Sequence, residues 1–265
     1  MLFDLFCVLF AVAISPFVFC HSWVERLMRI ELNGTMIGDP GYIRGTMSRL
    51  DPAFTDTVMQ SLLTDFDEPI CKATQATRRY SVEFPALKAH AGDFVALQYQ
   101  ENGHVTMLRN SPHKAGSGEV FVYGTSMPHG NDHLASVYGA WNREGTGGSA
   151  RGRLLGTWSF DDGQCYQIND SYLSRERQRL FPKTALYPSG ADLWCQIDVR
   201  LPSDISNWYT LYWIWVWPNL GPSVSEEIYT SCMDIKVLPG TQEGSLGFVQ
   251  GQDLNFAAIE EQMNY

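Results

Sequence analysis

Residues 209–217 read YTLYWIWVW, and every one of them except Leu211 is aromatic or β-branched. Such residues favour β-strands, and an apolar run without alternation is typical of a strand that is covered on both faces. We therefore predict a central strand here. A strand of this kind needs neighbouring strands on both edges and a packed layer on each face, which the rest of the chain must provide.

Further strand-like runs lie on both sides of this segment, separated by turns rich in Gly, Pro and Asp. They span residues 23–32, 81–84, 93–100, 104–108, 119–123, 154–160, 165–168, 194–201 and 228–237. Short strands divided by such turns predict an all-β fold, an antiparallel β-sandwich with long loops and short helices.

Three segments have a locally helical pattern. One lies near residues 55–63, inside the long loop 33–70, and the others span 170–180 and 257–263. No repeat or linker divides the strands, so we predict one domain over residues 21–237. We expect the C-terminal tail, residues 238–265, to be poorly ordered.

The first 20 residues, MLFDLFCVLFAVAISPFVFC, form an apolar run with the length and position of a secretory signal peptide. Asp4 stands where basic residues are usual, and the run is nearly long enough to cross a bilayer, so an uncleaved anchor is the alternative. Pro16 and the absence of flanking basic residues favour cleavage. Cleavage after Cys20 would make His21 the first residue of a secreted, extracellular chain.

The composition narrows the range of partners. The net charge is −10 and no basic stripe runs along the chain, which argues against a nucleic-acid partner. The eight Trp residues fit a densely packed core or, alternatively, an exposed face that stacks on carbohydrate. We expect the core to hold most of them.

Four cysteines remain after cleavage, namely Cys71, Cys165, Cys195 and Cys232. An even number in a secreted chain predicts two disulfides, for which three pairings are possible, and the spacings do not match a zinc site. Asn33 and Asn169 each begin an N-glycosylation sequon, which agrees with an extracellular location.

An N-terminal His21 is the most specific chemical feature of the chain. Its α-amino group and an imidazole nitrogen can bind one metal ion together, and the amino group has a pKa of about 7.7–8.0, so it releases its proton at little cost. A second histidine would complete a T-shaped set of three nitrogens, which suits Cu(II) better than Zn(II). We therefore predict one copper ion at His21, provided that cleavage occurs as proposed.

The second histidine is expected at His104. It follows a predicted strand and an Asn102-Gly103 turn, so it would lie at one end of the sandwich, within reach of the N-terminus. Glu227 and Tyr229 alternate on the last strand and therefore share a face. Taken singly, His104 fits a surface or capping role and Tyr229 an ordinary strand position.

Together these residues resemble the lytic polysaccharide monooxygenases, in which an N-terminal and an internal histidine hold copper on an immunoglobulin-like sandwich. Three matches carry the resemblance, in order along residues 21–237. They are the N-terminal His21, the strand and turn AGDFVALQYQENGH ending at His104, and residues 227–232, EIYTSC, where cellulose-active fungal members have Gln-x-Tyr-x-x-Cys. The chain is most similar to a fungal secreted branch that begins HSWVE.

The resemblance implies a role for each of these residues. His21 and His104 would form a histidine brace around copper. Tyr229 would be the axial ligand, and Glu227 would lie beside the position where oxygen reacts. A glutamate replaces the glutamine of cellulose-active members, as in some chitin- and xylan-active relatives. Those cellulose-active members also carry a histidine on the strand before it, where residues 209–217 have none.

The resemblance also implies how the cysteines pair. A loop cysteine is tied to the last strand three residues after the axial tyrosine, which joins Cys71 to Cys232. Cys165 and Cys195 remain as the second pair, and they close a loop of about 30 residues, worth roughly 3–4 kcal/mol.

Other potential sites have simpler explanations. His129 and His133 are four residues apart, but the intervening glycine and asparagine indicate a loop rather than a zinc-binding helix. Asp161 and Asp162 precede a glycine, and Asp-Asp-Gly is more typical of a hairpin turn than of a glycosidase acid. The chain has no GxSxG motif, the sign of a serine nucleophile.

The resemblance thus implies a secreted, monomeric copper monooxygenase that cleaves a polysaccharide of the cellulose, xylan or chitin type, using electrons from an external donor. The alternative is a non-catalytic copper-binding protein of the same fold, serving copper uptake or contact with the cell wall. A third possibility, a sandwich without metal, applies if His21 is not the N-terminus.

Overall fold

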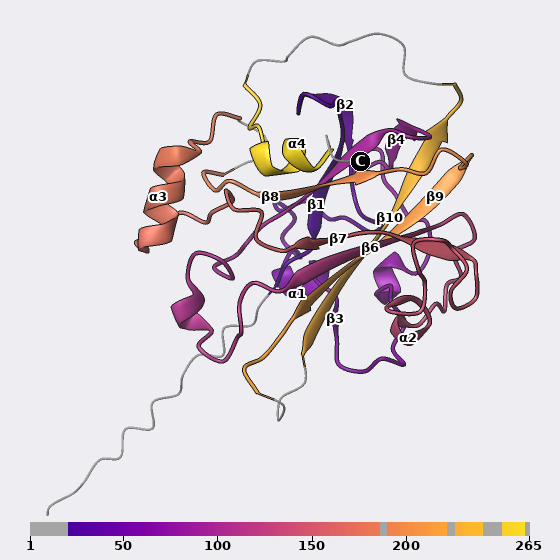
Figure 1. Ribbon diagram of the computed structural model, residues 1–265, viewed down its shortest axis with the longest axis horizontal. Helices are drawn as coiled ribbons and strands as arrows, with labels where there is room; N and C mark the ends of the chain where they lie inside the picture. The colour runs from indigo at the N-terminus through magenta and orange to yellow at the C-terminus, as the bar shows by residue number, and fades with distance from the viewer. Residues whose placement is uncertain (1–20, 186–189, 222–225, 241–250, 263–265) are drawn as a thin grey trace, which may run out of the picture.

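The computed structural model describes residues 21–185, 190–221, 226–240 and 251–262. The proposed signal peptide, residues 1–20, therefore lies outside the described residues. Within the described ranges, ten strands form two sheets with the main core between them (Figure 1). The strand pairs are antiparallel, apart from one parallel pair at a sheet edge. The prediction of an all-β sandwich is confirmed.

The smaller sheet has the order β2 (Met36–Gly41), β1 (Val24–Ile30), β5 (Phe94–Tyr99) and β8 (Cys195–Arg200). The larger sheet has the order β3 (Leu62–Leu63), β10 (Glu227–Leu238), β9 (Trp208–Trp217), β6 (Glu119–Thr125) and β7 (Gly152–Ser159), and β4 (Leu87–His90) pairs in parallel with β10.

Strand β9 is central, as the apolar run predicts. It pairs with β10 on one edge and with β6 on the other, and every residue after Trp208 is buried. Its alternate residues enter two different cores. Residues 209, 211, 213, 215 and 217 face the core between the sheets, whereas 212, 214 and 216 face a second core on the outside of the larger sheet. Burial on both faces explains why the strand is apolar throughout.

The helices are short, as expected. They are α1 (Asp56–Met59), α2 (Leu134–Val137), α3 (Tyr172–Leu180) and α4 (Phe256–Gln262). Helix α3 begins where Ser171 caps the amide of Ser174, and its buried Arg177 forms an ion pair with Asp161 (2.7 Å). None of the helices in the described ranges is long and apolar enough to span a membrane.

Three predicted strands do not form in the described part of the chain. Residues 81–84 make a turn in which Ser81 Oγ accepts a hydrogen bond from Phe84 N (3.0 Å). Residues 165–168 make a single bridge, from Tyr166 to Leu193, beside a turn held by the Asp162 carboxylate. The third, residues 104–108, is described below with the site.

Strands β2, β3 and β4 form where no strand was expected. The sequence of β2, MIGDPG, contains the residues of a turn, but β2 is an edge strand, and an edge position tolerates a proline that has no amide to pair.

Part of the C-terminal segment predicted to be poorly ordered is packed on the smaller sheet. Helix α4 lies against β8, where the Gln262 amide donates to the carboxylate of Asp198. Before this helix, the Gln252 side chain donates to Met36 O (2.7 Å) and accepts from Met36 N (2.8 Å), as a neighbouring strand would. In the structure the polar side chains of these residues satisfy buried and edge groups of the sheet, and the poor order of the tail stays a prediction. Residues 241–250 lie outside the described ranges.

The free edge of β10 is covered by short segments, and one of them brings in a buried ion pair. Ile43 bridges to Met233, and the next residue, Arg44, makes two hydrogen bonds of 2.7 Å to the fully buried carboxylate of Asp234. The hydroxyl groups of Thr210 and Tyr80 donate to the same carboxylate. Burial alone would raise the pKa of Asp234, but the hydrogen bonds and charge of Arg44 outweigh it and hold this pKa below its usual value.

We predict that Arg44→Met lowers the free energy of unfolding at pH 7 by about 3–5 kcal/mol, because it leaves a buried carboxylate without its main cation. Urea unfolding measures the change. Arg153→Met is the matched control: Arg153 and Asp204 form an ion pair in which both side chains are exposed, and losing such a pair costs less than about 1 kcal/mol.

The decrease in the free energy of unfolding caused by Arg44→Met should become smaller in acid. In the parent, the lowered pKa of Asp234 adds stability above the unfolded-state pKa of about 3.9, and this stability is lost as the pH falls through the folded-state pKa. In the variant, the buried carboxyl of Asp234 is protonated at a higher pH. The difference in free energy of unfolding between parent and variant should therefore become smaller as the pH falls from 7 to 4. A difference that stays constant from pH 7 to pH 4 would contradict the assignment.

Candidate metal centre

His21 lies just before β1, and the chain around it is fixed at two points. Val24 N donates to Ser231 Oγ on β10 (3.2 Å), and Asn102 Nδ2 donates to the carbonyl oxygen of His21 (2.6 Å). The residue predicted to be the mature N-terminus is therefore held between the turn after β5 and the strand β10.

His104 follows a tight turn at the end of β5. Asn102 and Gly103 have φ values of 47° and 80°, the left-handed conformation that these two residue types tolerate best. The buried carboxylate of Glu101 then accepts hydrogen bonds from the amides of the two residues after His104 (2.8 and 3.2 Å). These bonds hold residues 104–108 in successive turns, which is why the strand predicted there is wrong.

The side chain of His104 is buried, with 2% of its surface exposed. Its ring lies against two indoles of β9, with centres 5.4 Å from Trp215 and 4.7 Å from Trp217. Its Nε2 atom is buried and has no hydrogen-bond partner among the described residues. Burial, reinforced by the positive charges of His21 and Lys114, lowers the pKa of His104 to about 3. The ring is therefore neutral at physiological pH, and the charge of His21 is one of the causes of this low pKa.

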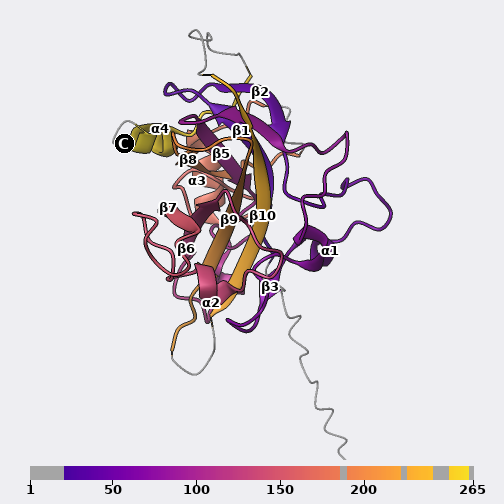
Figure 2. The same cartoon turned by 90° about the vertical axis from the view of Figure 1, so that its right-hand side faces the viewer.

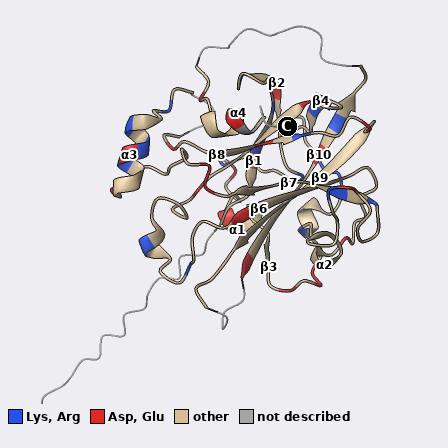
Figure 3. Cartoon of the chain, viewed as in Figure 1, with Lys and Arg blue, Asp and Glu red and all other residues tan. Residues whose placement is uncertain are grey.

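The imidazole of His21 has a different partner near each nitrogen. Nε2 lies 3.1 Å from Oδ2 of Asp56, at the start of α1, and Nδ1 lies 3.4 Å from Nδ2 of Asn102. A carboxylate beside Nε2 favours the tautomer that carries its proton there, and this tautomer keeps a lone pair on Nδ1. Figure 2 shows α1 and its loop on the opposite side of β10 from β6 and β7, and Figure 3 shows acidic and basic residues dispersed over the strands, helices and loops.

Glu227 and Tyr229 meet at the start of β10. The Tyr229 hydroxyl donates to Oε2 of Glu227 (2.7 Å), and Oε1 of Glu227 lies 2.7 Å from Nζ of Lys114. Both carboxylate oxygens are thus engaged. The Tyr229 ring stacks on Trp215 (5.0 Å between centres), the same indole that lies against His104.

Lys114 is a site residue that sequence reasoning missed. Its side chain is fully buried, and Nζ also donates to the carbonyl oxygen of Trp217 (3.3 Å) and lies 4.2 Å from the centre of the Trp217 ring. The loop that carries it is fixed to β9, since the indole nitrogens of Trp215 and Trp217 donate to backbone oxygens of Ser117 and Gly116. The loop sequence HKAGSG is typical of a solvated turn, so no local signal marks this lysine as buried.

The structure joins Cys71 to Cys232 and Cys165 to Cys195, the two pairings that the resemblance implies. Of the two sequon residues, Asn33 is exposed. The Nδ2 atom of Asn169, to which a glycan would be attached, donates to Thr106 Oγ1 (2.8 Å) and to the carbonyl oxygen of residue 167 (2.9 Å).

The alternative sites have structural roles. His133 caps the start of α2 in extended conformation, and His129 lies in the loop before it. Asp162 is half-buried, and its carboxylate accepts hydrogen bonds from the amides of residues 164, 165 and 196 and from the side chain of Asn255. These bonds make Asp162 the centre of a turn, as the Asp-Asp-Gly pattern indicates.

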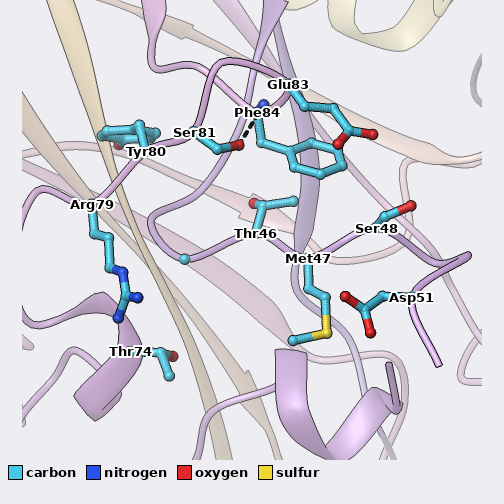
Figure 4. Close-up of a pocket in the computed structure, with 11 residues that line it drawn as sticks. Thr46, Met47, Ser48, Asp51, Thr74, Arg79, Tyr80, Ser81, Glu83 and Phe84 are labelled. Carbon is cyan, nitrogen blue, oxygen red and sulfur yellow. Dashed lines mark hydrogen bonds between the residues drawn. The ribbon is translucent and has the colours of Figure 1, made fainter. Parts of the chain in front are cut away.

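A separate cavity of about 410 Å³ opens between residues 45–51 and 79–84 (Figure 4). Phe84, Met47 and Arg79 contribute to its wall, with several hydroxyl groups and two acidic side chains. It contains none of the site residues predicted from the sequence.

Comparisons with known proteins place the chain in a family. The family model described as Domain of unknown function (DUF7492) matches residues 18–260. No curated protein shows significant sequence similarity to the chain.

Three solved structures show a distant likeness. A cellulose-active polysaccharide monooxygenase from M. thermophila is 16% identical, with a TM-score of 0.34 over 86% of this chain and 82% of that one. The cellulose-active LPMO CelS2 in complex with copper is 17% identical, with a TM-score of 0.31 over 60% of this chain and 57% of that one. An AA10 lytic polysaccharide monooxygenase from Streptomyces lividans is 9% identical, with a TM-score of 0.28 over 64% and 65%. These likenesses are too distant to say what the chain does.

We predict that His104 stays neutral in the metal-free protein down to pH 4, because its burial disfavours the charged ring. The imidazole signals of the exposed His113 and His129 serve as internal references in the same spectra. NMR titration of the imidazole signals measures all three. Because an unfolded His104 binds a proton below about 6.5, this residue should also reduce stability as the pH falls from there. Protonation of His104 near pH 6 in the folded chain would contradict the burial argument.

Proposed function

We propose that this chain, which belongs to the family described as Domain of unknown function (DUF7492), is a secreted copper protein that oxidises a polysaccharide. One copper ion would bind to His21 and His104 once cleavage has freed the α-amino group of His21. The observation that carries the proposal is the buried, unpartnered Nε2 of His104 beside a residue that can become an N-terminal histidine. Buried polar atoms normally have partners, and a metal would supply one here.

The environment of His21 also fits a metal. An ion held by the α-amino group closes a six-membered chelate ring through Nδ1, whereas Nε2 points away from such a ring. The carboxylate of Asp56 lies beside Nε2 and would hold the proton there, leaving Nδ1 as the ligand atom. Asn102 Nδ2 would keep its hydrogen bond of 2.6 Å to the carbonyl oxygen of His21, and the metal would replace its longer contact of 3.4 Å with Nδ1.

Tyr229 and Glu227 would complete the site. Because the Tyr229 hydroxyl donates a hydrogen bond to Glu227, its oxygen keeps lone pairs with which it could contact a bound metal without becoming a phenolate. Glu227 is only partly buried and could accept or return a proton at the solvent side of the site. A bound copper ion supplies one-electron redox chemistry with dioxygen or peroxide, after reduction by an external donor.

The reaction would remove hydrogen from a glycosidic C–H bond of a cellulose-, xylan- or chitin-type polymer. The described residues themselves do three things: they hold the metal, shield His104 from water with two indoles, and position a carboxylate. The protein is expected to act as an extracellular monomer, with N-glycosylation sequons at Asn33 and Asn169.

A non-catalytic copper-binding protein is the second candidate, and two observations favour it. Both oxygens of Glu227 are already engaged by Lys114 and Tyr229, which restrains the carboxylate. All eight Trp residues are buried or half-buried, so none offers a fully exposed indole for stacking on a polymer. The same copper ligands would then serve copper uptake or contact with the cell wall.

We predict that the mature chain beginning at His21 binds one equivalent of Cu(II) in calorimetric titration. His104→Ala should lower the affinity by more than the roughly 10–100-fold typical of losing an outer-shell partner, because it removes one of three nitrogens. Placing one glycine before His21 should do the same, since the amine becomes an amide. Tyr229→Phe should still bind copper, with an altered Cu(II) spectrum. If the His104→Ala protein binds as tightly as the parent, the ligand assignment is wrong.

A second measurement separates the two candidate functions. The copper-loaded protein is incubated with ascorbate and oxygen on cellulose, xylan and chitin, and both hydrogen peroxide and oxidised oligosaccharides are measured. We expect oxidised sugars from at least one polymer and none from the His104→Ala control. Tight copper binding with neither product would favour the non-catalytic protein.

A further inference from the structure

The ion pair between Lys114 and Glu227 is unusual in its position. Lys114 is fully buried, whereas Glu227 has 28% of its side chain exposed, so the pair runs from the interior to the surface beside the proposed metal. A lysine is rarely buried completely because losing its hydration is costly unless partners replace the water.

Around Lys114, protein groups take the place of water and hold the ammonium group in one position. Nζ contacts the carboxylate of Glu227 (2.7 Å), the carbonyl oxygen of Trp217 (3.3 Å) and the face of the Trp217 ring (4.2 Å). The loop around it is held by two indole hydrogen bonds, and Gly118 at its end is required because a Cβ there would lie 2.2 Å from Val216 O. The cation is therefore built into the fold.

The same Trp217 ring separates this cation from His104. The indole contacts the ammonium group on one side and the His104 ring, 4.7 Å away between centres, on another. A charge in such a water-poor region is only weakly screened, so it acts on whatever His104 binds.

We propose that Lys114 is a positioning residue of the metal site, which clamps Glu227 and balances its charge so that the site accommodates both Cu(I) and Cu(II). This inference rests on the proposed function. A fixed positive charge destabilises Cu(II) more than Cu(I), and the carboxylate of Glu227 has the opposite effect. Because the two charges offset each other, the affinity for Cu(I) relative to Cu(II) stays near the value that the three nitrogens of His21 and His104 would give alone.

The experiment measures the dissociation constants for Cu(I), by competition with a chromophoric chelator, and for Cu(II), by calorimetry. Lys114→Met removes the positive charge with little change of shape and should shift the ratio of the two constants about tenfold in favour of Cu(II), or 59 mV for one electron. Glu227→Gln should shift it by a similar factor in favour of Cu(I). The double variant should return close to the parent. Lys88→Met is the control, because Lys88 is exposed on β4 and pairs with the far end of β10.

Shifts of opposite sign that cancel in the double variant support the proposal, since a merely structural defect would weaken both ions alike. The proposal would be overturned if Lys114→Met changed the dissociation constants for Cu(I) and Cu(II) by the same factor. It would also be overturned if the ratio of the two constants in the double variant differed from the parent's by more than in either single variant. Should Lys114→Met fail to fold, Glu227→Gln alone decides: a ratio equal to the parent's overturns the proposal. A parent that binds no copper overturns the proposed function and this inference together, whereas a copper-binding parent with parallel shifts overturns only the inference.

Discussion

The burial of β9 on both faces is the constraint from which the rest of the structure follows. A strand with large side chains on both sides needs two cores, and the chain provides the smaller sheet for one and the outer loops with α2 for the other. The disulfide between Cys71 and Cys232 contributes to the outer core, so it joins a loop to the strand that flanks β9. The long loops are therefore a structural layer of this protein as well as the carriers of its chemistry.

The candidate metal centre is built on one end of the same strand. Trp215 and Trp217 shield His104, fix the loop of Lys114 through their indole nitrogens, and pair through their backbones with Tyr229 and Glu227 of β10. Each indole thus serves the core with its ring and the site with its polar edge. Changes to either indole would disturb the core and the candidate site together.

The sequence predicts those features that depend on local pattern. The all-β class, the central strand at 209–217 and the Asn102-Gly103 turn follow from strand propensity, apolar run length and backbone preference. Residues 104–108 were predicted to be a strand because their pattern is strand-like, but the carboxylate of Glu101 captures the amides that a strand would pair. A side chain that competes for backbone amides leaves no mark on hydrophobic periodicity.

Long-range charge contacts lie beyond local pattern for the same reason. Lys114 is 113 residues from its partner Glu227, and Asp56 lies 35 residues from His21, in a loop whose sequence resembles any polar loop. Only the folded sheets bring these groups together. The sequence singles out His21 and His104 because a predicted processing site and a turn mark them, whereas the groups around them carry no such mark.

The C-terminal segment has a consequence for self-association. Gln252 occupies the backbone groups of Met36 on the open edge of β2, and Gln262 satisfies the buried carboxylate of Asp198. An uncovered edge strand can pair with the edge of another molecule. Removal of residues 251–262 by a protease would therefore leave the residues of the candidate metal centre in place and yet let two molecules pair through β2. Truncation at this end would thus change the solubility of the protein before it changed the candidate site.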